Sequence, residues 1–435
     1  MKILLWHGYL LGGTGSNVYT RSLARAWSRL GHEVIVFCQE PHPEQYDVGG
    51  ARVVRPEIGE LLPVFVLDRY EDLEARLLQD FGVAERERVV QANAGALREH
   101  LPADLVFANH VLLGSPVGAA SGAPFAVKAH GSELEFSMRG NPELCAWARK
   151  TLANARAVFA GTEHIRDVLE AVVGRGEYLR RVHVVPPGVD TDEFRPEARD
   201  VALEALVGEA ESDPPNPPEA YDERRPDEGN AARLAAFLSG DGPTVVYFGK
   251  LSREKGVHLL IEALRRIEAR AVIVGFGEAR AELEAQAREI SFGRAFARSG
   301  KGRVLFTGPL EHRHLVHLLP LADATVVPSI FPEAFGMVAA EAAACGCPPL
   351  VARHSGLAEV AEGLEAEYPA EHRGLASFAS GDVDDLTSKL DAVLSLPRGE
   401  WDRLSQACRA AATARWSWEH VAALILSSPW ETPSA

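Results

Sequence analysis

The chain has 435 residues, which exceeds the usual size of a single hydrophobic core, so two domains are expected. Its formal charge of −16 and its lack of long basic runs argue against nucleic acid or an anionic membrane as the main partner. No uninterrupted apolar stretch reaches the roughly 18 residues of a transmembrane helix.

The cysteines and the N-terminal residues bear on the compartment. Cys345 and Cys347 are too close together for a usual disulfide or a CxxC zinc knuckle, which favours a reducing, cytoplasmic environment. The apolar start, MKILLWHGYLLGG, is short and continues into a glycine-rich turn and an amphipathic helix, so a secretory signal is not expected. The sequence does not indicate an oligomeric state.

The first part of the chain alternates short apolar runs with helical patterns, starting with a run at 2–8 and a helix at 16–30. Further runs begin at Glu33, Asp104, Phe125, Ala157 and Val182. Continuous β-rich runs separated by helices predict a parallel sheet covered on both faces. Residues 1–185 are therefore expected to form a doubly wound, Rossmann-like domain.

A change of composition follows at residues 186–240, and 211–230 combines prolines and acidic residues with few apolar ones. Such a segment buries little apolar surface, so we expect a mobile linker or a surface insertion. Alternation then restarts over 241–415, which predicts a second doubly wound domain of class α/β. Residues 416–435 contain an amphipathic helix that we expect to pack back toward the first domain.

Two glutamates flank the most informative motif, FPEAFGMVAAEAAACGCPPLV from Phe331. Glu333 lies in the loop after an apolar strand and Glu341 lies on the next helix, at the sheet edge where open α/β folds bind ligands. Chance spacing on a solvated helix is the alternative, but the alanine-rich context of Glu341 favours a buried carboxylate with a partner.

The helix that carries Glu341 begins close to a predicted phosphate site. Unpaired backbone N–H groups at a helix start bind anions, and here they belong to Phe335, Gly336, Met337 and Val338. Carboxylates beside such a site can accept hydrogen bonds from sugar or ribose hydroxyls, so the pattern suggests a sugar nucleotide.

Further polar residues follow neighbouring strands of the second domain. Lys250 and Lys255 follow the strand from Thr244, where their ammonium groups could pair with a diphosphate. Gly275 and Gly277 follow the next strand and form either a nucleotide wall or an ordinary turn. Solvated surface lysines are the alternative for the first pair.

The first domain offers two candidates. Gly13 lies in a glycine-rich loop, LLGGTGSN, before a helix with Ser16 as its expected N-cap, and a tight structural turn is the alternative to a phosphate or sugar contact. His130 follows a strand in AVKAHGSELE, where it could contact the sugar or the acceptor.

A metal site is not expected. His312, His314 and His317 cluster in EHRHLVH, but none is paired at i, i+4, and the segment is expected to be an exposed helix start.

These motifs together resemble the retaining glycosyltransferases of family 4, which have the GT-B architecture of two Rossmann-like domains facing each other across a cleft. The likeness covers nearly the whole chain, including GGTGSN, HGSELE, PPGVDTDEFRP, GKLSREKGVHLLIEAL, VGFG and the glutamate motif.

By this resemblance, Glu333 would hold donor-sugar hydroxyls and Glu341 the ribose hydroxyls. Lys250 and Lys255 would bind the diphosphate, which Gly13 would approach from the other domain. N–H groups around Gly336 would help bind donor phosphate or sugar, and His130 would position sugar or acceptor.

The resemblance also implies the reaction, which is transfer of a sugar from a nucleotide-diphosphate donor to an acceptor hydroxyl with retention of configuration. We expect front-face displacement without a metal or a tightly bound cofactor, and UDP is favoured over GDP or ADP. The acceptor is open among small metabolites, natural products, glycans and lipids. An epimerase or phosphorylase and a silent sugar-nucleotide-binding subunit are the alternatives.

The chain departs from the common family pattern at three places. Lys250 stands where arginine is frequent, which keeps the charge but loses the bidentate fork. The acidic insertion at 211–230 is additional, and HSGLAEV from His354 lacks a doubled glycine. The last two departures are expected to leave the core motif untouched.

Overall fold

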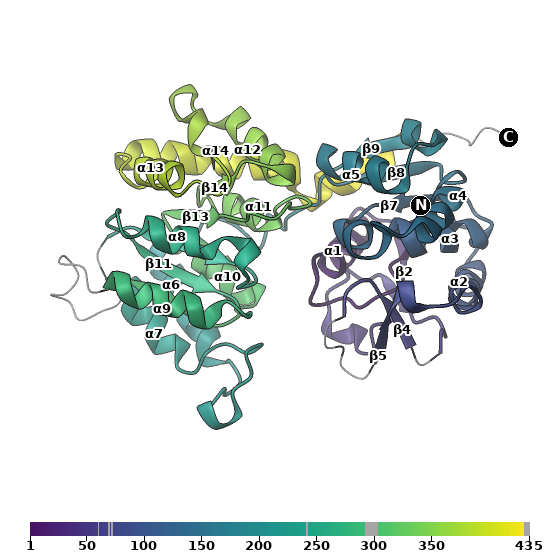
Figure 1. The fold of residues 1–435 in the computed structure, drawn as a ribbon, viewed down its shortest axis with the longest axis horizontal. Coiled ribbons are helices and arrows are strands. Elements are labelled where there is room, and N and C mark those ends of the chain that lie inside the picture. Colours follow the sequence, from purple (N-terminus) through teal and green to yellow (C-terminus); the bar gives the residue numbers. More distant parts are fainter. Residues whose placement is uncertain (60, 68–69, 71–72, 241, 292–302, 430–435) are drawn as a thin grey trace. The chain divides into compact units, whose positions relative to one another are not determined.

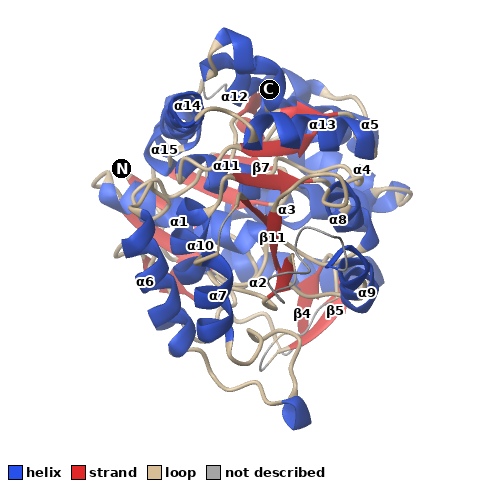
Figure 2. Ribbon diagram, turned by 90° about the vertical axis from the view of Figure 1, so that its left-hand side faces the viewer, coloured by secondary structure: helices blue, strands red, loops and turns tan. Residues whose placement is uncertain are grey.

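The computed structural model describes residues 1–59, 61–67, 70, 73–240, 242–291 and 303–429 (Figure 1). The chain forms two compact units, Met1–Gly188 with Trp418–Ala435, and Val189–Ser417. In both units helices pack against parallel strands (Figure 2).

The described part of the first unit contains a seven-stranded parallel sheet in the order β3-β2-β1-β6-β7-β8-β9. The strands are β1 Lys2–Trp6, β2 Glu33–Phe37, β3 Arg52–Val54, β6 Leu105–Asn109, β7 Phe125–Lys128, β8 Ala157–Ala160 and β9 Val182–Val184. A separate pair consists of β4 Leu61–Val64 and β5 Glu74–Leu77.

Helices cover both faces of this sheet. They are α1 Gly15–Arg29, α2 Val83–Arg98, α3 Val111–Ser121, α4 Pro142–Leu152, α5 Glu163–Val173 and α15 Trp418–Ser427. Successive side chains of a strand point to opposite faces. Ile3 and Leu5 therefore pack in the core that contains α1 and α15, whereas Leu4 and Trp6 pack in the core that contains α2 and α3.

The second unit has its own sheet, which in the described residues has six parallel strands in the order β12-β11-β10-β13-β14-β15. The strands are β10 Thr244–Phe248, β11 Arg270–Val274, β12 Val304–Phe306, β13 Ala324–Val327, β14 Pro349–Ala352 and β15 Ser377–Phe378. Its helices are α6 Arg199–Glu211, α7 Asn230–Leu238, α8 Val257–Ala263, α9 Arg280–Ser291, α10 His312–Leu318, α11 Met337–Ala344, α12 Ser355–Glu367, α13 Val383–Leu394 and α14 Arg398–Trp416.

Both sheets reverse their strand order next to the first strand. The chain runs outward from β1 to β3 and returns at β6, and it runs outward from β10 to β12 and returns at β13. The loops at the carboxyl ends of β1 and β6, and of β10 and β13, therefore flank switch points, where such sheets bind ligands. The predicted site residues lie in these loops and their neighbours.

Every strand that the sequence predicts is present, and the structure adds β3, β4, β5 and β15, which were not expected. The first helix begins at Gly15 with Thr14 as its N-cap, and not at Ser16, and Thr14 makes no side-chain capping hydrogen bond.

The proline-rich segment is an ordered surface insertion between α6 and α7. Asn216 is 2% exposed, and its Nδ2 donates to the carbonyls of Asp222 and Pro226 at 3.0 Å each. The N–H of Asp222 donates back to Asn216 Oδ1 at 2.8 Å. Buried hydrogen bonds thus replace the apolar core that this segment lacks. No helix in the described residues is long and apolar enough to cross a membrane.

Candidate functional site

Lys255 and Glu333 form an ion pair at the switch point of the second sheet. Lys255 ends a short helical turn after β10, and Glu333 lies in the loop between β13 and α11. Lys255 Nζ lies 2.5 Å from Glu333 Oε1, and the two side chains are 34% and 21% exposed. An ammonium group and a carboxylate are thus held together while both remain accessible to a ligand.

The loop between β14 and α12 fixes the backbone of Glu333. The N–H of Glu333 donates to Ser355 Oγ at 2.9 Å, and its carbonyl accepts from the N–H of Gly356 at 3.0 Å. Ser355 has a φ of 48°, which is unusual for a residue other than glycine. The expectation that HSGLAEV leaves the core motif untouched is therefore wrong, because this loop holds Glu333 in place.

Lys250 lies in the loop after β10 and is mostly exposed, with its Nζ 3.9 Å from Glu278 Oε2. The hydroxyl of Tyr247 donates to the Lys250 carbonyl at 2.8 Å, which anchors the backbone of this loop. The ion pair with Glu278 places the Lys250 side chain beside the loop after β11.

Gly275 and Gly277 let the loop after β11 pack tightly against the loop after β10. A Cβ on Gly275 would lie 1.8 Å from the Gly249 carbonyl oxygen, so this position tolerates only glycine. The N–H of Leu251 donates to the Phe276 carbonyl at 2.7 Å across the same junction. A structural role of both glycines is therefore established, whereas their part in a nucleotide wall stays a prediction.

The start of α11 has the geometry expected of an anion site. Gly336 is the N-cap with a φ of 118°, and Met337 and Val338 begin the helix, where N–H groups have no partner within the helix. Phe335 is buried, with its ring centroid 5.8 Å from that of Trp416. Its side chain thus contributes to packing, and only its backbone is available as an anion contact.

Glu341 is 5% exposed in the middle of α11. Burial raises the pKa of its carboxyl group to about 8. His312 Nε2, at the first residue of α10, lies 3.6 Å from Glu341 Oε1. This contact could not be predicted from the sequence, because the two residues lie on different helices.

The other two histidines of α10 also face carboxylates. His314 Nε2 lies 3.1 Å from Asp213 Oδ1, and His317 Nδ1 lies 2.8 Å from Glu197 Oε2. His314 is fully buried, so the expectation of an exposed helix start is wrong at this position. Among the described residues, no three histidine, cysteine or acidic side chains lie close enough together to hold a metal ion.

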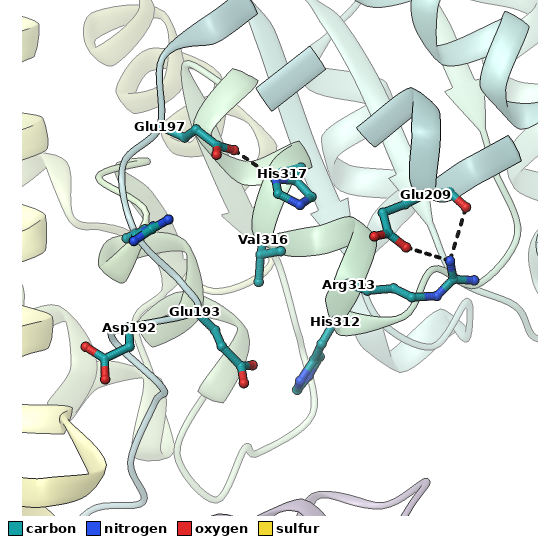
Figure 3. Close-up of a pocket in the computed structure, with 9 residues that line it drawn as sticks. Asp192, Glu193, Glu197, Glu209, His312, Arg313, Val316 and His317 are labelled. Carbon is teal, nitrogen blue, oxygen red and sulfur yellow. Dashed lines mark hydrogen bonds and ion pairs between the residues drawn. The ribbon is translucent and has the colours of Figure 1, made fainter. Parts of the chain in front are cut away.

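A cavity of about 390 Å³ lies beside α10 (Figure 3). Its lining residues are Asp192, Glu193, Arg195, Glu197, Glu209, His312, Arg313, Val316 and His317. Figure 3 shows that Arg313 reaches Glu209 and that His317 reaches Glu197, so both of these carboxylates already have a partner in the lining. Lys255 and Glu333 are not among its lining residues.

In the first unit, a chain of hydrogen bonds fixes the orientation of His130. The Thr20 hydroxyl donates to the Ser16 carbonyl at 2.8 Å and accepts from Asn109 Nδ2 at 3.1 Å. Asn109 Oδ1 must then accept from His130 Nε2, at 2.9 Å. His130 Nδ1 is left as an acceptor, which suits a ligand hydroxyl that donates.

Burial and the nearby His110, Lys128 and His7 hold the pKa of His130 well below its usual range. Glu133 lies beneath it, fully buried, and its Oε1 accepts from the N–H of His130 at 2.8 Å. The other oxygen of Glu133 lies 3.2 Å from His110 Nδ1. His130 is thus neutral, and hydrogen bonds to Glu133 and Asn109 hold it in place.

Gly13 lies in the loop after β1 with a φ of 91°, and no atom lies within 4 Å of the position that its Cβ would take. The loop is therefore open at Gly13. The hydrogen bond from Asn17 Nδ2 to the Gly12 carbonyl ties the same loop to the start of α1.

Comparisons with known proteins identify the family. Residues 233–415 match the family described as glycosyl transferases group 1, and residues 13–193 match glycosyltransferase family 4. A D-inositol 3-phosphate glycosyltransferase of Xylanimonas cellulosilytica is 30% identical over 438 residues, covering 95% of this chain and 90% of that protein. The chain belongs to the family 4, group 1 glycosyltransferases, and it is a transferase enzyme.

Solved structures agree on the fold. The Anabaena protein HepE in complex with UDP has a TM-score of 0.65 at 18% identity, covering 98% of each chain. Sucrose-phosphate synthase from Thermosynechococcus elongatus has a TM-score of 0.65 at 21% identity, covering 98% of this chain and 97% of that one. The fold is GT-B, as the sequence motifs predicted.

Proposed function

We propose that the enzyme transfers a sugar from a UDP-sugar to an acceptor hydroxyl with retention of anomeric configuration. The observation that carries this proposal is the Lys255–Glu333 ion pair at the switch point of the second sheet. Glu333 lies in the loop that leads directly into α11. Glu333 would accept hydrogen bonds from donor-sugar hydroxyls, and Lys255 would face the diphosphate. Donor binding would then place a phosphate oxygen near an ammonium group that now contacts only a carboxylate in the described structure.

The remaining donor contacts follow the sheet edge. Lys250 would reach the diphosphate from the loop after β10, with the N–H groups of Met337 and Val338 at the helix start. Glu341 would accept hydrogen bonds from both ribose hydroxyls. Burial of Glu341 favours this role, because a buried carboxylate is stabilised by hydrogen bonds from two hydroxyl donors.

In the proposed reaction, the bond between the anomeric carbon and the diphosphate oxygen breaks as the acceptor oxygen forms a new bond on the same face. The departing diphosphate takes the acceptor proton, so no enzyme carboxylate forms a covalent bond to the sugar. Lys250, Lys255 and the helix start would stabilise the charge that develops on the leaving group, which is the role a metal ion has in other enzymes. His130 would accept a hydrogen bond from a hydroxyl of the sugar or the acceptor.

Support for UDP comes from the HepE structures, which were solved in complex with UDP and with UDP-glucose. The name of the Xylanimonas relative makes D-inositol 3-phosphate the first acceptor to test. Cytoplasmic location is proposed on the spacing of the cysteines.

The test is incubation with UDP-, GDP- and ADP-sugars, with and without D-inositol 3-phosphate and a library of other hydroxyl acceptors. Acceptor-dependent release of nucleoside diphosphate, with a glycosylated product in the mass spectrum, supports the proposal. Epimerised donor would instead indicate an epimerase, and donor binding without any turnover would indicate a silent binding subunit.

A further inference from the structure

The acidic insertion lies against the predicted donor edge of the second sheet. The N–H of Asp227 donates to the carbonyl of Thr307, the residue after β12, at 2.8 Å. The Asp227 carboxylate forms two hydrogen bonds with Arg280 at the start of α9, at 2.5 and 2.9 Å. The insertion is thus fastened to the loops that follow both β11 and β12.

Gly308 allows the backbone of the insertion to approach closely. A Cβ at Gly308 would lie 2.9 Å from Asp227 Oδ1 and 3.0 Å from the Arg225 carbonyl oxygen. Together with the buried hydrogen bonds of Asn216, this contact gives the segment a defined position. These contacts lie at the loops after β11 and β12, outside the glutamate motif.

Two side chains of the insertion lie beside the loop that contains Gly275 and Gly277 and beside the start of α9 that follows it. The Arg224 guanidinium lies 5.7 Å from the ring centroid of Phe276, the residue between these glycines. Tyr221 Oη accepts from Arg280 Nη1 at 2.8 Å, and its own O–H can donate. The insertion therefore places two side chains with donor groups beside the loop after β11 and the start of α9.

The position of Glu341 indicates which part of a nucleotide-sugar donor would reach the insertion at the loops after β11 and β12. If Glu341 holds the ribose, the ribose lies near His312, since the two side chains are 3.6 Å apart. His312 begins α10 directly after the loop at 307–311, to which the insertion is fastened. The base is attached to the ribose, so the loops after β11 and β12 are within its reach.

We propose that the segment 213–229 forms one wall of the nucleobase end of the donor site, and that Arg224 and Tyr221 select the base. This inference rests on the proposed nucleotide-sugar donor. Guanidinium is a donor only, and a phenol can donate, so both suit a ring carbonyl. Uracil and guanine present a carbonyl where cytosine and adenine present an amino group. The segment thus favours UDP or GDP over CDP or ADP.

The test is isothermal titration of UDP, GDP, CDP and ADP into the full-length enzyme and three variants. The wild type should bind UDP about tenfold more tightly than CDP, or GDP about tenfold more tightly than ADP, whichever of UDP and GDP it prefers. This factor is expected for one charged hydrogen bond. Arg224→Ala should reduce this ratio to about threefold or less, and Tyr221→Phe should reduce it by a smaller factor.

The matched control is Arg225→Ala. Arg225 is the neighbouring exposed arginine, but its guanidinium faces Asp222 and the Pro215 carbonyl within the insertion, at 3.9 and 3.5 Å. The ratio of affinities for the carbonyl and amino bases in Arg225→Ala should equal that of the wild type. Circular dichroism checks that each variant is folded. Tight binding with an unchanged ratio in Arg224→Ala, or an equal loss in Arg225→Ala, would overturn only this inference. Absence of any nucleoside diphosphate binding by the wild type would overturn the proposed function with it.

Discussion

At the scale of single residues, Glu341 has the most unusual environment of the proposed donor site. It is almost fully buried, and this burial raises the pKa of its carboxyl group to about 8. An ionised carboxylate accepts hydrogen bonds from two ribose hydroxyls, whereas the protonated form has less acceptor capacity. Donor binding at neutral pH should therefore be coupled to loss of this proton.

We predict that the KM for the donor falls as the pH rises from about 6 to about 9, because the fraction of ionised Glu341 grows over this range. Glu341→Gln should raise the KM and flatten this pH dependence, while kcat changes less. Steady-state kinetics across the pH range measures both effects, with the exposed Glu289→Gln as the control. An equally steep profile in Glu341→Gln would assign the titration to another group.

The raised pKa of Glu341 also predicts that the stability of the folded protein depends on pH. A carboxyl pKa raised from 4.5 to about 8 means that the folded chain keeps a proton which the unfolded chain releases. The contribution of this proton to the free energy of unfolding is fully present below the ordinary carboxyl pKa and is lost as the pH rises toward 8. The melting temperature of Glu341→Gln minus that of the wild type should therefore increase from about pH 5 to about pH 8. A constant difference in calorimetric scans would contradict the raised pKa.

His130 offers a second test at this scale, through Asn109. Asn109→Asp keeps an acceptor for His130 Nε2 but adds a negative charge, which should raise the pKa of His130 by about one unit or more. Histidine NMR measures this pKa directly, and transfer should decline at the lower pH values where His130 now becomes charged. Thr20→Val, which removes only the outer partner of Asn109, should leave the pKa low. An unchanged pKa in Asn109→Asp would refute the proposed hydrogen-bond chain.

At the scale of elements, the loop between β14 and α12 supports the β13–α11 loop. Ser355→Ala removes the acceptor of the Glu333 N–H and should lower kcat/KM about tenfold, with a stability loss of about 1 kcal/mol. Ser355→Gly should lose activity similarly but keep more stability, since glycine accepts the positive φ without strain.

The control for this loop is Ser395→Ala, an exposed serine at the end of α13, which should leave both quantities unchanged. Kinetics and urea unfolding give the two readouts. Wild-type activity in both Ser355 variants would show that the loop does not position Glu333.

The C-terminal helix α15 belongs to the core of the first unit. Trp27 Nε1 donates to the Ala422 carbonyl at 3.2 Å, and Trp418 lies edge-on to Tyr19 with ring centroids 5.3 Å apart. Trp418→Ala should therefore destabilise the protein by about 3–5 kcal/mol, whereas the exposed Glu419→Ala should cost almost nothing. Denaturant titration checks this, and a loss below about 1 kcal/mol would show that α15 is only loosely attached.

The sequence predicted the main strands because continuous apolar runs bounded by polar loops have few other solutions in a parallel sheet. It predicted that Lys255 and Glu333 lie at one sheet edge, and the ion pair brings them together. It did not predict the contacts of Ser355, His312 and Asn109 with the site residues, because these contacts join separate elements. The order of the insertion was the hardest feature to predict from the sequence, since buried hydrogen bonds of Asn216 hold it in place without an apolar pattern.

At the scale of the whole molecule, the two units repeat one arrangement. Each has a parallel sheet with a switch point, and each places glycine-rich loops and polar side chains at the carboxyl ends of its strands. The second unit contains the proposed donor contacts, and the first contains Gly13 and His130. The family places both units in one enzyme, so the activity should require the full chain.

The proposed leaving-group stabilisation by lysines and a helix start predicts independence from divalent metal ions. Activity should stay within about twofold after EDTA treatment and dialysis, because ammonium groups supply the positive charge. Rates with and without added Mg²⁺ or Mn²⁺ measure this. A large loss that either ion restores would contradict the metal-independent mechanism.

The central claim is that Glu333 and Lys255 bind and activate a nucleotide-sugar donor. Its most direct test is acceptor-dependent release of UDP by the wild type, Glu333→Gln and Lys255→Ala, with Glu289→Gln as an exposed control on α9. We predict that both site variants lower kcat by about 100-fold or more while their circular dichroism spectra and the control's rate stay at wild-type values. Turnover near the wild-type rate in either site variant would contradict the account.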